Sequence, residues 1–481
     1  MAMKKSTLLL LLFALLAGLP GRAQELRLRK GVVLDSLFLA DSLPGHTGLY
    51  LPTNFDPGVS WPLLLVLGEE EDLMQMLRYY RNVAESNGYI LAASRLGTDS
   101  ATLTKQVVHM GKVLRQLAEV LPLDRKQISL SGFGIDGQLA ALMPNLLRGV
   151  QGVLTLGAVP LEAAEATADP PADFVGIMGR ADFGYPEMIR VEAQLDRRKT
   201  PHFVLYYEGG HQRPPEDILR LGLEALDLLG MKSGRKERDT GYIQARFEAY
   251  INYLNALRSR GQWLLAFDQA EEGIHLFEGL HPTESLSDIR KAIRKTSGYA
   301  SQRREFNTFR LKEDVRRQYM TVALDEDLAT FNLSNLGWWN YQMEELSNLE
   351  QSTHQEERLM GLRLKGFANA LADDYIHLIE LDKMPDYDAL IFLYMLKTIT
   401  DPQAPENYLQ VISLTAKYDD FGTALYYLEE LLKRGYQDQA ALYQINHTAL
   451  LRIGPEFNAL IAKYLGGARY GLPEKADQMN R

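Results

Sequence analysis

The chain has no cysteine among its 481 residues. This absence excludes disulfides, thiolate metal sites, a cysteine nucleophile and a lipid-modified cysteine anchor. Histidine is scarce as well, with nine residues and no HExxH spacing, so we predict no metal site and no cofactor. Acidic residues outnumber basic ones by 62 to 52, and the net charge of -10 argues against nucleic acid as a partner.

The first residues have the order of a secretory signal. Lys4 and Lys5 precede an apolar run from Leu8 to Leu19, and the segment Pro-Gly-Arg-Ala that follows ends at Ala23. We therefore predict a signal peptide over residues 1–23, and an uncleaved anchor is the alternative. The run is shorter than the about 20 residues that a spanning helix requires. The mature protein is thus expected to be periplasmic or secreted, with no membrane span and no lipoprotein anchor.

Residues 24–230 alternate between short apolar blocks and amphipathic helical stretches. Continuous apolar blocks are typical of strands that are buried on both faces, and their alternation with helices predicts an α/β domain with a doubly wound, mostly parallel sheet. Ligand sites in such sheets lie at the carboxyl ends of the strands. The predicted strands are Leu63–Leu67, Tyr89–Ala93, Ile128–Ser131, Gly152–Leu156, Phe174–Met178 and His202–Tyr207.

The character of the chain changes after residue 230. Residues 231–241 are charged and almost free of apolar side chains, which predicts an exposed linker between two domains. Residues 242–481 show helical periodicity, which predicts an all-α domain. Residues 416–464 resemble the terminal segment of tetratricopeptide arrays, and a weaker match covers 261–270. A helical bundle with chance spacing is the alternative to a helical repeat domain.

Three segments of the first domain follow one another in an order seen in a known family. They are Leu49–Leu67, Val83–Leu91 and Asp124–Phe133. In this order they resemble the α/β-hydrolase family, in particular secreted esterases of the polyhydroxyalkanoate-depolymerase and feruloyl-esterase-like type. The resemblance extends from about Leu49 to Leu229 and implies a serine nucleophile on a tight strand-to-helix turn, together with an acid and a histidine.

The nucleophile position departs from the family pattern. After Leu130 the family reads Ser-Gly-Phe-Ser-x-Gly-Gly or close to it, whereas this chain reads Ser-Gly-Phe-Gly-Ile-Asp-Gly from Ser131 to Gly137. Gly134 therefore occupies the place of the catalytic serine. Glycine tolerates a strained turn, so the fold can persist, but without a hydroxyl no acyl-enzyme can form.

The other two members of the triad are present by resemblance. Asp182 lies in a loop similar to the family's acid loop, and His211 follows Gly-Gly in a segment similar to the histidine loop. The oxyanion loop differs, because Gly68 is followed by Glu69 and three further acids where the family has His-Gly-Gly or similar small residues. Four acids there would oppose a developing negative charge. We interpret the acidic run as a solvated loop, and a calcium site is the alternative.

Three other residues are candidates for a catalytic role in the absence of a serine at position 134. Ser131 and Asp136 flank the turn, but the first is expected to point into packing and the second to begin a helix. His211 could serve as a general base on water, with Asp182 orienting it, or the pair could be purely structural.

We therefore predict an exported pseudoenzyme that binds a protein or peptide partner through its helical repeats. A small molecule or polymer is a possible ligand of the hydrolase-like cleft. The alternative is a secreted serine-hydrolase-type esterase or peptidase with a displaced nucleophile, and the sequence leans towards a protein that is not an enzyme.

Overall fold

The structure, a computed structural model, describes residues 29–37, 47–68, 73–95, 103–160 and 172–470. An eight-stranded sheet with the order β1-β2-β4-β3-β5-β6-β7-β8 forms the centre of the first part. Strands β3 to β8 run parallel to one another, and β2 runs antiparallel to both of its neighbours, β1 and β4. The strands are β1 (Val33–Leu37), β2 (Thr47–Tyr50), β3 (Trp61–Gly68), β4 (Ile90–Arg95), β5 (Leu123–Phe133), β6 (Gly152–Leu156), β7 (Asp173–Gly179) and β8 (His202–Tyr207).

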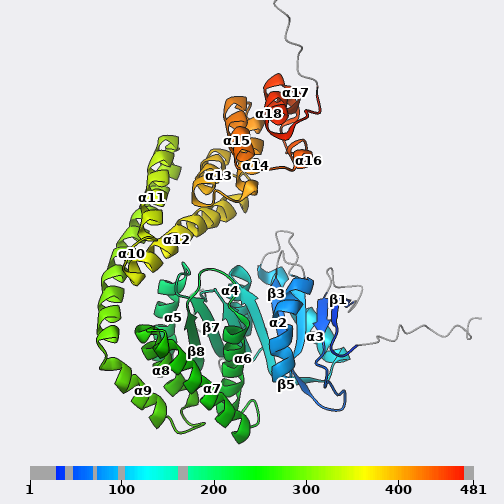
Figure 1. Ribbon diagram of the computed structural model, residues 1–481. Helices are drawn as coiled ribbons and strands as arrows, with labels where there is room; N and C mark the ends of the chain where they lie inside the picture. The colour runs from blue at the N-terminus through cyan, green and yellow to red at the C-terminus, as the bar shows by residue number, and fades with distance from the viewer. Residues whose placement is uncertain (1–28, 38–46, 69–72, 96–102, 161–171, 471–481) are drawn as a thin grey trace, which may run out of the picture.

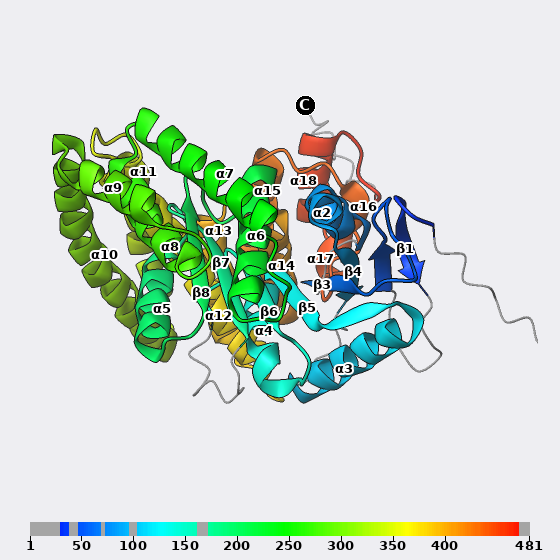
Figure 2. The same ribbon diagram turned by 90° about the horizontal axis from the view of Figure 1, so that it is seen from below.

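Helices cover both faces of this sheet. Figure 2 shows α2 and α6 on one face and α3 and α4 on the other. The central strand β3 is apolar along its length, as burial on both faces requires, and its Leu63, Leu64 and Leu65 have no exposed surface. The helices of this part are α2 (Leu73–Asn87), α3 (Leu103–Val120), α4 (Ile135–Leu146), α5 (Tyr185–Arg198) and α6 (Glu216–Lys232).

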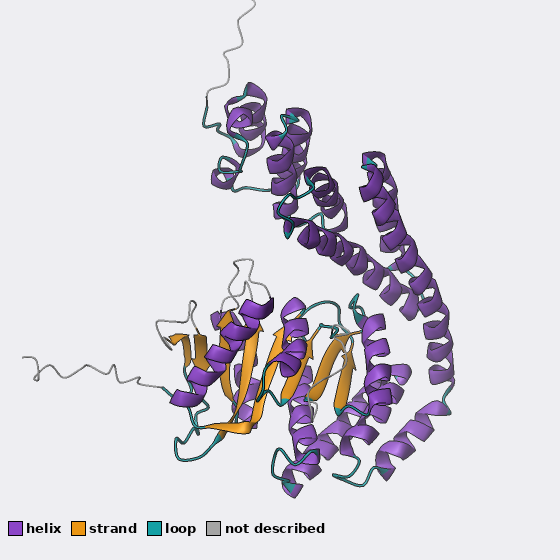
Figure 3. Ribbon diagram, turned by 180° about the vertical axis from the view of Figure 1, so that it is seen from behind, coloured by secondary structure: helices purple, strands orange, loops and turns teal. Residues whose placement is uncertain are grey.

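The rest of the described chain is helical. Figures 1 and 3 show a band of helices that passes beside the sheet and then continues above one end of its strands. Together with the sheet, this confirms the predicted fold class of an α/β part followed by an all-α part. The helices are α7 (Thr240–Ser259), α8 (Trp263–Phe277), α9 (Glu284–Arg294), α10 (Ser297–Thr330), η1 (Leu333–Asn335), α11 (Leu336–Leu349), α12 (Gln355–Glu380), α13 (Tyr387–Thr400), α14 (Pro405–Lys417), α15 (Phe421–Lys433), α16 (Gln439–Leu442), α17 (Ala449–Ile453) and α18 (Pro455–Leu465).

The hydrophobic core of the sheet continues into the first helices of the second part. One buried cluster extends from Leu49 to Phe306 and includes side chains of α7, α8 and α9. Two further clusters cover Phe309–Leu414 and Tyr408–Ile461. The predicted linker joins α6 to α7, and within it Lys236 forms an ion pair of 2.6 Å with Asp227 of α6. Helices α7 to α9 therefore pack as part of the sheet domain's core, whereas a division at residues 231–241 stays a prediction.

The last strand of the sheet has its outer edge covered by α8. The Glu272 carboxylate accepts a hydrogen bond of 2.9 Å from the Val204 N–H, and the Gln269 amide donates one of 3.1 Å to the Val204 carbonyl. Both side chains are buried. Buried backbone groups of an edge strand need such partners, which explains why α8 carries polar residues on its sheet-facing side.

Two predictions made from the sequence concern residues that the structure does not describe. The signal peptide and the acidic residues from Glu69 to Asp72 lie outside the described residues. Within the described ranges, no helix is both long and apolar enough to cross a membrane.

Candidate functional site

A tight turn between β5 and α4 forms the centre of the candidate site. Gly134 lies between the two elements with φ of 55° and ψ of -125°, a conformation that residues with a side chain rarely adopt. Its N–H donates a hydrogen bond of 3.0 Å to the Leu156 carbonyl. A Cβ on Gly132 would lie 2.5 Å from the backbone of Asp136, and one on Gly137 would lie 2.6 Å from the Ala158 Cβ. These contacts explain the glycines on either side of the turn.

Asp182 and His211 come together at the same end of the sheet. Nδ1 of His211 lies 2.8 Å from Oδ2 of Asp182, and the other carboxylate oxygen accepts a hydrogen bond of 2.8 Å from the Gly184 N–H. Asp182 has no exposed surface, whereas the side chain of His211 is 34% exposed. Because the carboxylate can only accept, Nδ1 carries the proton and the lone pair of Nε2 is free to accept one.

The free nitrogen of His211 faces the turn. A Cβ built on Gly134 would lie 3.6 Å from Nε2 of His211. The residues that the sequence places in the triad are therefore together in space. A base and the carboxylate that orients it are present, and the position from which a hydroxyl would attack holds only hydrogen.

The two neighbouring serine and aspartate candidates have other roles. Oγ of Ser131 is buried, lies 2.8 Å from the Tyr80 hydroxyl and donates a 2.7 Å hydrogen bond to the Leu154 carbonyl. Asp136 lies in the first turn of α4, where a carboxylate interacts favourably with the helix dipole. Gly68 ends β3 at the same edge of the sheet, and Glu69 is not among the described residues.

Aromatic rings and one glycine that the sequence analysis did not single out complete the surroundings of His211. The rings of Phe133 and Phe183 lie with their centroids 4.9 and 4.6 Å from the imidazole. Gly157 follows β6 with φ of 54°, and a Cβ there would lie 3.2 Å from Oδ2 of Asp182. The position of Gly157 directly after a predicted strand is the sequence feature that could have assigned it to the site.

The histidine loop has its own anchor in β8. The Tyr207 hydroxyl donates a hydrogen bond of 3.0 Å to the Gln212 carbonyl. Burial, with a smaller contribution from the charge of Asp182, raises the pKa of Tyr207 to about 12. The hydroxyl therefore stays protonated and remains a donor at neutral pH.

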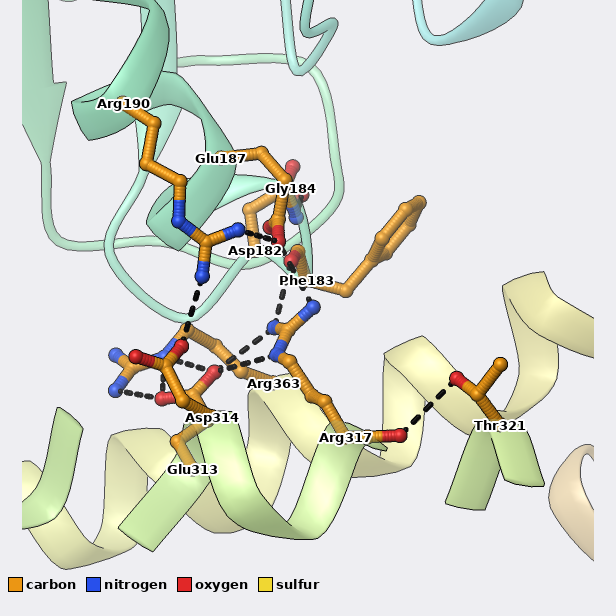
Figure 4. Close-up of polar contacts among 10 residues, drawn as sticks. All are labelled: Asp182, Phe183, Gly184, Glu187, Arg190, Glu313, Asp314, Arg317, Thr321 and Arg363. Atoms are coloured by element: carbon orange, nitrogen blue, oxygen red, sulfur yellow. Dashed lines mark hydrogen bonds and ion pairs between the residues drawn. The ribbon is translucent and has the colours of Figure 1, made fainter. Parts of the chain in front are cut away.

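Helices α10 and α12 hold the acid loop from the outside (Figure 4). Arg317 of α10 donates a hydrogen bond of 2.7 Å to the Phe183 carbonyl. Arg363 of α12 donates one of the same length to the Arg180 carbonyl. The backbone on both sides of Asp182 is thus fixed by side chains that follow it by more than a hundred residues.

A single carboxylate joins the two arginines. Glu313 of α10 is buried and bonds Arg317 at 2.8 Å and Arg363 at 2.7 Å. Arg180 is also buried, and it forms ion pairs with Glu208 at 2.7 Å and with Glu356 of α12. Buried charges require partners of opposite charge, so the helical part contributes to the support of the acid loop.

Among the described residues, no group of three or more histidine, aspartate or glutamate side chains is arranged to hold a metal ion. The acidic run after Gly68 lies outside the described residues, and the absence of a metal site stays a prediction.

The chain is similar to known proteins in structure but not detectably in sequence. No protein-family profile matches the chain, and no curated protein sequence matches it. The structure is similar to a fluorophosphonate-binding serine hydrolase of Staphylococcus aureus, with 13% identity, a TM-score of 0.33 and coverage of 42% of this chain and 98% of that one. It is also similar to esterase 2 of Thermogutta terrifontis, with 16% identity, a TM-score of 0.34 and coverage of 42% of this chain and 93% of that one. For dipeptidyl peptidase 4 of Porphyromonas gingivalis the identity is 12% and the TM-score 0.32, and the match covers 41% of this chain and 34% of that one.

Proposed function

We propose that the chain is an exported, non-catalytic hydrolase-like protein that acts as a binding module, with its helical part serving as a scaffold for a protein partner. One observation carries the proposal. Gly134 occupies the turn that Nε2 of His211 faces, so the nucleophile that this geometry would activate is absent. In this proposal residues 416–464 are tetratricopeptide-like, and fully buried Ala424 supports the close helix contact that such repeats need.

Retention of the Asp182–His211 pair is compatible with a structural role. Asp182 is fully buried, and a buried carboxylate without hydrogen bonds would be strongly destabilising. His211 supplies one of its hydrogen bonds and links the acid loop to the histidine loop. The pair therefore stabilises the end of the sheet whether or not any reaction takes place.

The proposal is tested by measuring hydrolysis of p-nitrophenyl acetate by the mature protein, the His211→Ala variant and the His354→Ala variant. His354 is an exposed histidine of the helical part and serves as the matched control. We expect no turnover that depends on His211. Turnover lost in His211→Ala and kept in His354→Ala would instead support the alternative, an esterase or peptidase with a displaced nucleophile.

The helical part offers a surface for a peptide. A cavity of about 460 Å³ lies among η1, α13, α14 and α15, and its lining includes Ile391, Phe392 and Met395. Leu333 and Tyr418 at its rim are 50% and 52% exposed. Asp388 and Asp420 also line it, so a peptide that carries apolar and basic side chains matches its chemistry.

Partner binding is tested by capture from the envelope fraction of the source cells. Leu333→Asp should abolish recovery of a partner, since it places a charge in the apolar cavity. Leu311→Asp, at a residue of α10 that is 69% exposed and outside the cavity, is the matched control and should leave recovery unchanged. Equal recovery with both variants would contradict a partner site in this cavity.

Export rests on residues 1–23 and is tested separately. If the signal is cleaved after Ala23, the N-terminal residue of the mature protein is Gln24. N-terminal sequencing of the protein from the envelope and culture medium measures this directly, and a chain that begins at Met1 would contradict cleavage.

A further inference from the structure

A second cavity lies away from His211, where the sheet meets the helical part. It has a volume of about 250 Å³ and is bounded by α5, β8, α8 and α10. Its lining is rich in carboxylates, with Glu192 and Asp196 from α5 and Asp268, Glu271 and Glu272 from α8. A cavity of this size and polarity can hold a small ligand rather than only packed side chains.

Most of these carboxylates already have partners. Glu272 accepts the Val204 N–H at 2.9 Å, and Glu192 accepts the Tyr206 hydroxyl at 2.5 Å. Glu271 forms an ion pair of 3.0 Å with Arg290. Asp268 differs from them, because none of the described residues gives its carboxylate a hydrogen bond or an ion pair, although the residue is only partly exposed. The positive charges of Arg303 and Arg180 act on it without direct contact. A partly buried carboxylate without a hydrogen bond leaves room for a cationic partner.

Aromatic rings form the remaining walls. The rings of Tyr185 and Tyr206 meet edge to face at 5.1 Å, and Tyr185 and Phe306 do so at 6.5 Å. The Arg303 guanidinium lies 5.8 Å from the centroid of Phe306, so the face of this ring already accommodates one cation. Aromatic faces combined with carboxylates are the surroundings that organic ammonium ions prefer.

A metal ion matches the negative charge of this cavity less well than an organic ammonium ion does. No set of three or more histidine, aspartate or glutamate side chains in the described part of the chain has the arrangement of a metal site. Hard divalent cations need about six oxygen ligands around one point, whereas the carboxylates here are spread over the walls of a cavity.

We propose that this cavity binds a compact organic ammonium group, with Asp268 as its anionic partner and Tyr185, Tyr206 and Phe306 as its aromatic wall. The ammonium group could belong to a free amine or to a lysine side chain of a protein, and the shared chemistry is a primary ammonium ion on a flexible aliphatic chain. The proposal does not depend on whether Gly134 has abolished catalysis.

Binding should strengthen as the pH rises from 6 to 8. Burial raises the pKa of Asp268 to about 7, the positive charges of Arg303 and Arg180 oppose this, and the negative charges of Glu192 and Glu271 add to it. Asp268 is therefore mostly neutral at pH 6 and mostly charged at pH 8. The other titratable or charged groups that face the cavity are Asp196 of α5, Tyr185 of α5, Tyr206 of β8, Glu272 and His275 of α8 and Arg310 of α10.

The test is calorimetric titration of the mature chain with 1,4-diaminobutane at pH 8 and constant ionic strength. We expect saturable binding that Asp268→Asn weakens by about tenfold or more, as loss of a desolvated charge pair implies. Asp288→Asn removes an acid of α9 whose side chain is 75% exposed and controls for net charge. N-acetyl-lysine amide is titrated in parallel. Stronger binding of this compound would identify a protein lysine as the source, and stronger binding of the diamine would identify a free amine.

Three outcomes would overturn the proposal. One is the absence of saturable binding of either compound up to about 10 mM. Another is equal weakening in Asp268→Asn and Asp288→Asn, which would reduce the effect to overall charge. The third, measured on the unmodified protein and so independent of whether a variant folds, is an affinity that does not rise between pH 6 and pH 8.

Discussion

Replacement of Gly134 by serine adds the hydroxyl that the site lacks. It tests whether this hydroxyl can form a hydrogen bond with Nε2 of His211. For a serine Oγ that lies about 1.4 Å from its Cβ and donates a hydrogen bond of about 2.8 Å, the Cβ would lie about 3.5 Å from the acceptor. The corresponding distance from Gly134 to Nε2 of His211 is 3.6 Å. The introduced hydroxyl can therefore reach His211 without movement of the backbone.

The substitution also has a predictable effect on stability. Gly134 has a φ of 55°, and a residue with a side chain in such a sparsely populated region costs about 1–3 kcal/mol. Gly134→Ala carries the same backbone strain without a hydroxyl and is the matched control. Urea unfolding should therefore show both variants destabilised by about 1–3 kcal/mol relative to the parent and by similar amounts relative to each other.

Labelling by a fluorophosphonate measures the new nucleophile. General base catalysis by a positioned histidine contributes about a hundredfold or more, so we expect Gly134→Ser to be labelled about 100 times faster than Gly134→Ala. His211→Ala in the serine background should remove that gain. A folded Gly134→Ser protein that is labelled no faster than Gly134→Ala would refute the assignment of Gly134 as the nucleophile position, and unchanged stability of both variants would refute the strain argument.

Three further substitutions test other parts of the structure. Glu313→Gln leaves two buried arginines without their carboxylate and should lower the free energy of unfolding by about 3–5 kcal/mol in urea, whereas the exposed Asp288→Asn should change it by less than about 0.5 kcal/mol. Equal effects would contradict the role of Glu313. Because the pKa of Asp268 is about 7 in the folded protein and about 3.9 unfolded, its protonation favours folding below pH 4, and this contribution is lost as the pH rises through 7. Asp268→Asn should therefore gain up to about 4 kcal/mol relative to the parent between pH 4 and pH 8, and parallel pH curves would contradict this. Gly157→Ala, at φ of 54°, should cost about 1–3 kcal/mol and shift the NMR signals of the His211 ring, and unchanged signals would contradict the close approach there.

The proximity of Gly134, Asp182 and His211 could be predicted because each lies in the segment that follows a parallel strand. Parallel strands bring their carboxyl ends to one edge of the sheet, so residues far apart in the chain meet there. The role of each position was implied by the resemblance to the α/β-hydrolase family, and these roles stay predictions.

The support of the acid loop could not be predicted in the same way. Glu313 and Arg317 lie in a highly charged stretch of α10, which in a sequence indicates a solvated helix face. They are buried because Arg363, from a different helix, completes the pairing and the loop carbonyls accept the remaining protons. That arrangement depends on how α10 and α12 cross the end of the sheet, and neither helix carries a local signal for it.

The extent of the core was likewise hidden from the sequence. The charged residues between α6 and α7 indicated a boundary, yet α7 to α9 share the core of the sheet. Polar Gln269 and Glu272 on α8 gave no sign of strand contact, because their partners are backbone groups of β8 rather than complementary side chains.

The cover on β8 has a consequence for how copies of the chain can associate. An uncovered edge strand presents N–H and C=O groups that recruit strands from other molecules, and this is a common route to aggregation. Here the N–H and the carbonyl of Val204 are both occupied by side chains of α8. Strand addition from another molecule at this position would first require α8 to detach from a buried core. The same helix that links the sheet to the helical part therefore also protects this edge from intermolecular pairing.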